Sequence, residues 1–193
     1  MAIEVESPTP RQVVDLVMRL SHCSWPTGDD ETVAWFRHHG LPGTGERRQP
    51  ADPSGPSFDG PAAATWPAHR FGWHTFRGEV VGVSWFLWDN LARDDVRSRA
   101  YELKKLLDGH FGPAADETPE VPEAYLGFTA LWTKSGRTVE MYFHTGLQYR
   151  PDGQILDGSA VVQLHLDDTQ RSHAKEAVAR QNARTRSSPP THQ

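Results

Sequence analysis

Histidine and carboxylate side chains in the C-terminal half of the chain have the spacing best suited to chemistry. His165 and Asp167 are two residues apart in an alternating segment, so in a strand they would share one face. His144 ends another alternating segment and would reach the same face if the two strands pair. Three such ligands would suit an open zinc site. Polar residues are equally expected on a solvent-facing strand, so we assign no metal and no cofactor.

Other reactive residue types have simpler explanations. Cys23 follows His22, a thiol beside a base, but neighbours in sequence seldom have the geometry that proton transfer requires. We therefore expect Cys23 to be a small, buried, apolar side chain. The acidic run Asp29 to Glu31 lies near an expected helix start, where the helix dipole accounts for it. The glycine-rich segments lack a P-loop lysine, and no catalytic residue is assigned.

Two large aromatic residues indicate a binding surface instead. In the segment GEVVGVSWFLWDN, alternation puts Phe86 and Trp88 on the face opposite Val83 and Trp85. Aromatic side chains on the less protected face of a sheet are typical of a protein-binding surface.

The segment from Gly127 to His144 predicts the hairpin that positions this surface. Ser135-Gly136 form a two-residue turn, since glycine supplies the positive φ that tight hairpins need. Alternation then assigns a core face, which comprises Phe128, Ala130, Trp132, Val139, Met141 and Phe143. The other face carries Leu131, Tyr142 and His144 and is left to solvent or a partner.

The remaining pattern predicts an α+β fold. Helices are expected after the N-cap Thr9, from Asp29 or Asp30 to Gly40, over 93–111 and over 169–184. Further strands are expected over 69–76, 79–88 and 160–167, with irregular segments at 41–68, 112–124 and 146–158. We predict a single antiparallel sheet of about five strands, covered by helices on one face. Residues 1–186 would form one domain with a Pro/Gly-rich loop at 41–68, and 187–193 a disordered tail.

Net charge and cysteine content limit the classes of partner that we expect for this protein. The chain has 193 residues and a formal net charge of -5, which argues against nucleic-acid binding because phosphate neutralisation needs lysine and arginine. A single cysteine and the lack of an apolar segment after Met1 predict a cytoplasmic protein without a membrane partner.

The order of elements resembles a known family. It is carried by VVDLVMRLSHCSW, GEVVGVSWFLWDN, LLDGHFGPA, LGFTALWTKSGRTVEMYF and AVVQLHL. Together these segments resemble uncharacterised small actinobacterial cytoplasmic proteins, several of which look like immunity proteins of polymorphic toxin systems. The same order is similar to the α+β scaffold of secretion chaperones, in which the sheet face away from the helices engages a partner.

These observations favour a protein-binding domain without catalysis, and the resemblance implies an immunity protein that neutralises a cognate toxin. The expected partner-binding residues are Phe86, Trp88, Leu131, Tyr142, His144, His165, Asp116, Glu117 and Glu120. The acidic members would cover a basic toxin site, with charge mainly accelerating association. Two alternatives stay open: a small-ligand or metal-dependent enzyme using the sheet face near His144 and His165, and a chaperone-like or structural subunit of a larger assembly.

Overall fold

The computed structural model describes residues 7–41, 43, 45–47, 56–60, 70–120, 126–149, 155–157 and 160–187. The expected tail 187–193 lies outside the described residues except for Ser187, which is the last residue of a helix, and so does much of the segment 41–68. The helices are α1 (Pro10–His22), α2 (Asp29–His38), α3 (Arg93–Phe111) and α4 (Thr169–Ser187). None of these described helices has the length and apolar character needed to cross a membrane.

Eight strands form one antiparallel sheet in the order β1-β2-β3-β4-β10-β7-β6-β5. They are β1 (Glu46–Arg47), β2 (Ser57–Gly60), β3 (Arg70–Phe76), β4 (Glu79–Leu87), β5 (Asp116–Thr118), β6 (Leu126–Lys134), β7 (Arg137–His144) and β10 (Val161–Asp168). Two further strands, β8 (Leu147–Tyr149) and β9 (Ile155–Asp157), pair only with each other. The predicted α+β class and antiparallel sheet are confirmed.

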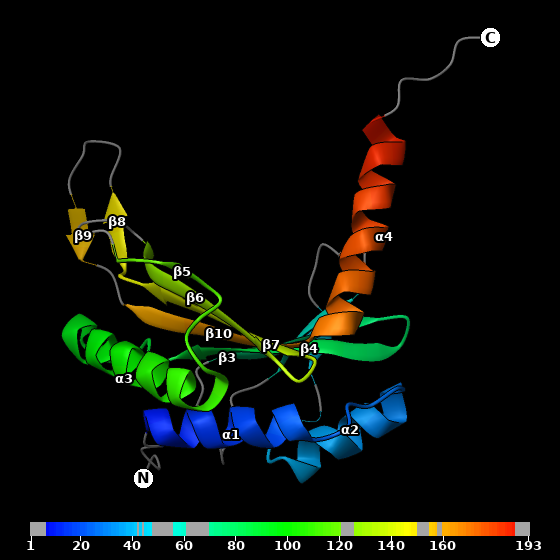
Figure 1. The fold of residues 1–193 in the computed structure, drawn as a ribbon, viewed down its shortest axis with the longest axis horizontal. Helices are drawn as coiled ribbons and strands as arrows, with labels where there is room; N and C mark the ends of the chain where they lie inside the picture. The colour runs from blue at the N-terminus through cyan, green and yellow to red at the C-terminus, as the bar shows by residue number, and fades with distance from the viewer. Residues whose placement is uncertain are drawn as a thin grey trace.

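The helices α1, α2 and α3 lie on one side of the sheet, whereas α4 leaves from the opposite side (Figure 1). The side chains between the sheet and the three helices form the core, with Trp85 and Trp132 fully buried. Phe36 of α2 packs edge-on against Phe71 of β3, with ring centroids 5.4 Å apart. Burial of this apolar area is the main force that holds the helices to the sheet.

Local sequence signals account for the helix and hairpin boundaries. Thr9 and Gln12 form the expected capping box at the start of α1, with Pro10 in its first turn. Ser135 and Gly136 both have positive φ, 52° and 76°, and Lys134 pairs with Arg137 as predicted. The predicted core face of this hairpin is buried, so its register is confirmed.

The prediction of about five strands is wrong because three short strands, at or next to the edges of the sheet, lie in segments that we expected to be irregular. β1 and β2 fall within 41–68, and β5 falls within 112–124. A strand of only two to four residues is held by hydrogen bonds from its neighbours in the sheet, so its own sequence carries little alternation. The segment 146–158, also expected to be irregular, contains β8 and β9.

Candidate functional site

The sheet side away from α1, α2 and α3 carries the candidate site, and we call it the open face. The register places on it Ser84, Phe86, Asp116, Thr129, Leu131, Glu140, Tyr142, His144, Gln163, His165 and Asp167. None of these residues is fully buried. No described helix other than α4 lies on this side (Figure 1).

One row of the open face runs across five strands. Asp116, Leu131, Glu140, His165 and Ser84 are successive partners on β5, β6, β7, β10 and β4. Neighbouring strands are about 4.8 Å apart, so an apolar side chain lies between the Asp116 and Glu140 carboxylates. The row therefore combines negative charge with a small apolar surface.

Tyr142 is the central aromatic residue of the open face. Its hydroxyl donates a hydrogen bond to Glu140 Oε2 at 2.9 Å. Its ring is stacked on His144, with centroids 6.3 Å apart, and meets His165 edge-on at 5.9 Å. Burial, followed by the hydrogen bond and charge of Glu140, raises the pKa of Tyr142 to about 12. Tyr142 is therefore a neutral donor and an aromatic surface at physiological pH, with no nucleophilic phenolate.

Gln163 connects the two histidines. Its Nε2 lies 2.7 Å from His165 Nε2, and its Oε1 lies 3.4 Å from His144 Nε2. Because an amide nitrogen can only donate, His165 accepts from Gln163, whereas His144 donates to it. Burial lowers the pKa of His144, which favours its neutral form. The Gln163 amide thus links the two histidine rings in one row of hydrogen bonds.

Asp167 has the most perturbed acid group of the open face. Its Oδ1 has almost no exposed surface and no hydrogen-bond donor, while Oδ2 lies 3.4 Å from the Ser172 hydroxyl of α4. Burial, followed by repulsion from Glu140, raises the pKa of Asp167 to about 7. An isolated buried carboxylate is unfavourable, so the protonated form is retained far above its usual pH range.

Gly82 of β4 makes room for this carboxyl group. A Cβ atom there would lie 1.9 Å from Asp167 Oδ1 and 2.4 Å from His74 Cε1. Real Cβ atoms do not come this close to other atoms, so the lack of a side chain on β4 lets Asp167 and His74 lie over it.

Substituting Gly82 with alanine is therefore expected to lower the free energy of unfolding by about 1–3 kcal/mol, through overpacking. Chemical denaturation monitored by tryptophan fluorescence measures the change. Gly109→Ala on α3 is the matched control, because a Cβ there meets nothing within 4 Å. Equal stability of Gly82→Ala and wild type would contradict the close packing around Asp167.

Six of the predicted binding residues lie on the open face: Phe86, Asp116, Leu131, Tyr142, His144 and His165. Trp88 does not, and its placement there is wrong. It follows the last residue of β4, has a positive φ of 63° and is 1% exposed. Its indole Nε1 donates to the Pro8 carbonyl at 2.6 Å, so the positive φ turns the ring away from the alternation of the strand.

The three predicted acidic residues are divided between the two sides of the sheet. Asp116 lies on the open face opposite Leu131. Glu117 pairs with Lys104 of α3 at 3.1 Å, and Glu120 forms an ion pair with Arg97 and accepts a hydrogen bond from Tyr101. Glu117 and Glu120 thus hold β5 and the residues after it against α3. The prediction that both residues lie on a free binding loop is therefore wrong.

The sequence left open whether His144, His165 and Asp167 converge, and the structure places them on a shared face only. The pairing of β10 with β7 puts all three on the same side of the sheet. Within the described part of the chain, however, no group of three or more histidine, cysteine, aspartate or glutamate side chains is close enough to hold a metal ion. His144 and His165 are bridged by an amide instead.

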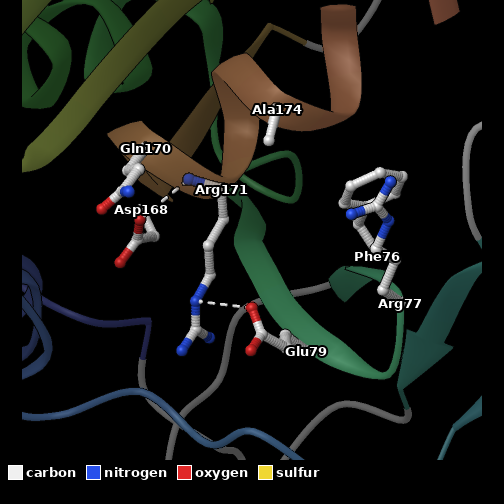
Figure 2. A pocket seen from close by; sticks show the side chains of 7 residues that line it. All are labelled: Phe76, Arg77, Glu79, Asp168, Gln170, Arg171 and Ala174. Carbon is white, nitrogen blue, oxygen red and sulfur yellow. Dashed lines mark hydrogen bonds and ion pairs between the residues drawn. The ribbon is translucent and has the colours of Figure 1, made fainter. Parts of the chain in front are cut away.

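A pocket of about 490 Å³ lies between the β3–β4 turn and the start of α4. Figure 2 shows Arg171 extending from α4 to Glu79, while Arg77 lies beside Phe76 at the turn. Asp168 accepts a hydrogen bond from the Arg171 backbone amide at 3.0 Å and so caps α4. The other charged side chains that line the pocket, Glu79, Asp168 and Arg171, form ion pairs or hydrogen bonds within the protein. These interactions indicate a structural role for the residues of this pocket.

The same junction contains the interactions that sequence reasoning missed. Arg137 of β7 binds Asp168, donates to the Cys23 carbonyl at 3.0 Å and lies over the Trp25 ring. Arg171 donates to the carbonyls of Pro26 and Val80, at 3.0 and 2.8 Å. The spacing of Asp168 and Arg171 fits a helix cap, but no sequence signal indicates which distant carbonyls the arginines reach.

No family model, curated protein or solved structure matches this chain.

Proposed function

We propose that this protein acts by binding another protein through the open face. The observation that carries the proposal is a broad antiparallel sheet that α1, α2 and α3 cover on one side only. The other side presents the partly exposed side chains of Phe86, Leu131 and Tyr142 among hydrogen-bonding groups. Aromatic groups with polar neighbours are the usual composition of a protein interface.

The chemistry of the face supports binding more strongly than catalysis. Ser84, His165 and Glu140 occupy one row, the residue types of a nucleophile, a base and its orienting acid. The Ser84 hydroxyl, however, donates to the Gly72 carbonyl at 3.5 Å. His165 accepts from Gln163, and Glu140 accepts from Tyr142. Each group is thus engaged with a partner that does not activate the serine.

Within protein binding, we propose the role of an immunity protein that neutralises a cognate toxin in the cytoplasm. The net charge of -5 and the acidic residues of the open face support a partner with a basic active site. The arrangement of helices on one sheet face with a partner on the other is also that of secretion chaperones, and a chaperone-like subunit is the related alternative.

A photo-crosslinking amino acid at Thr129 tests the binding surface. Thr129 lies on the open face, and we expect the probe to capture one discrete partner in cells of the source organism. The same probe at the exposed Lys105 of α3 is the control. The captured protein must then bind the purified chain, and Tyr142→Ala must weaken that binding at least about tenfold, as for an interface hot spot.

Growth assays test the immunity role separately. Expression of the captured protein alone should arrest growth, and coexpression of the wild-type chain should restore it. If the probes at Thr129 and Lys105 captured the same proteins, or if neither captured any, binding through the open face would be contradicted. A captured protein without toxicity would contradict the immunity role and leave the chaperone-like alternative.

The second candidate is a small-ligand or enzymatic function of the same face. It is favoured by the pKa of about 7 of Asp167, because acid groups that titrate near neutral pH often act in proton transfer. Thermal shift with a metal and metabolite library, on wild type and on a His144→Ala, His165→Ala variant, checks it. A shift lost only in the variant would support a ligand site, and unchanged melting in both would dispose of it.

A further inference from the structure

The carboxylates on β4, β5, β7 and β10 differ in their pairing between the two sides of the sheet. On the side of α1 to α3, Asp108, Glu117 and Glu120 form ion pairs with lysine or arginine of α3. At the root of α4, Glu79 and Asp168 form ion pairs with arginines. On the open face, Asp116, Glu140 and Asp167 form no ion pair with any described residue.

The strands that carry these open-face carboxylates supply no cation nearby. The described open-face side chains of β4, β10, β7, β6 and β5 include no lysine or arginine. Attraction by Lys175 of α4 lowers the pKa of Asp167, but less than burial and Glu140 raise it. The five strands therefore supply no lysine or arginine of their own to these open-face carboxylates.

The surroundings of Glu140 suit the side chain of arginine or lysine. Leu131 lies between Glu140 and Asp116 in the same row and can contact an aliphatic stem. Tyr142 donates to Glu140, and its ring is adjacent to those of His144 and His165. Aromatic rings beside a carboxylate attract cations through both the ring face and the charge.

We propose that the partner contacts the open face with a basic segment, and that an arginine or lysine of this segment binds Glu140 over Leu131 and beside Tyr142. The inference rests on the proposed function and adds the chemistry of the partner. It also gives Glu140 and Asp116 the cations that the carboxylates on the opposite side obtain from α3.

Isothermal titration with an octa-arginine peptide at low ionic strength tests the site, with octa-glutamate as the negative control. Glu140→Gln keeps an acceptor for Tyr142 and removes only the charge. It is expected to weaken octa-arginine binding about threefold or more, as for a close ion pair, whereas Glu102→Gln on exposed α3 changes it less than about twofold. Amide shifts on peptide addition should centre on Leu131 and His165.

Equal weakening by Glu140→Gln and Glu102→Gln would overturn the inference, because diffuse attraction to an acidic protein would then explain all binding. Absence of peptide binding to the wild type would overturn it as well. Binding experiments with the captured partner distinguish the proposal of a basic segment from the proposal of the binding surface. If it still crosslinks through Thr129 but binds Glu140→Gln and wild type equally, the basic segment is wrong and the binding surface stands. If no partner is captured there, the binding surface itself fails.

Discussion

Replacement of Asp167 by asparagine is expected to stabilise the protein at pH 8. The carboxyl group lies over Gly82, its Oδ1 receives no hydrogen bond, and the charge of Glu140 repels its ionised form. Above its pKa of about 7 the group must carry a buried charge, which asparagine avoids while keeping nearly the same shape. We expect a gain of about 2–4 kcal/mol, the upper end being the free energy equivalent of the pKa shift.

The direction of the pKa shift of Asp167 determines how the free energy of unfolding changes with pH. In the unfolded chain Asp167 loses its proton near 3.8, whereas in the folded protein it keeps the proton until about pH 7. Between these values the folded state binds more protons, so raising the pH lowers the free energy of unfolding. The contribution of Asp167 is therefore most favourable below about pH 4 and is lost as the pH passes 7. Denaturation of wild type and Asp167→Asn from pH 4 to pH 8 should show a gap that widens with pH.

Asp15→Asn is the control, since Asp15 is an exposed carboxylate on α1. It should leave the pH dependence of wild type unchanged, whatever the other acid groups contribute. The groups around Asp167 are Glu140 of β7, His74 of β3, and Ser172, Lys175 and Glu176 of α4. If Asp167→Asn destabilised the protein equally at every pH, the carboxylate would have to be ionised and well paired, contrary to the geometry.

The parts of the fold predictable from sequence are those in which local chemistry and pattern agree. The Thr9 cap, the Ser135-Gly136 turn and the alternating core face from Phe128 to Phe143 each depend on residues close in sequence. The short strands β1, β2 and β5 depend on hydrogen bonds from neighbouring strands, so their sequences carry no comparable signal.

The candidate site was predictable in composition but not in its interactions. Alternation places Leu131, Tyr142, His144 and His165 on one face correctly. It misplaces Trp88, because one residue with positive φ ends the alternation and no local signal announces it. The amide bridge of Gln163 and the burial of Asp167 depend on which strands are neighbours, which the sequence does not specify.

Arg137→Ala is expected to cause the largest loss of stability. Its side chain is largely buried and joins three parts of the molecule: Asp168 at the start of α4, the Cys23 carbonyl after α1, and the Trp25 ring at 4.9 Å. Removing one member of a buried ion pair leaves the other charge without compensation, which typically costs about 3–5 kcal/mol. Urea denaturation measures the loss. Arg180→Ala, which breaks only an exposed pair within α4, should cost less than about 0.5 kcal/mol.

A double variant separates lost charge compensation from lost packing. Asp168→Asn keeps an oxygen that can accept from the Arg171 amide and cap α4, but it removes the negative charge that Arg137 neutralises. If the uncompensated carboxylate dominates, Arg137→Ala with Asp168→Asn should be more stable than Arg137→Ala alone. If the contacts to Cys23 and Trp25 dominate, adding Asp168→Asn should give no recovery, because those contacts are already absent. Recovery of stability, or its absence, therefore shows whether charge compensation or packing onto the helical layer makes Arg137 indispensable at this junction.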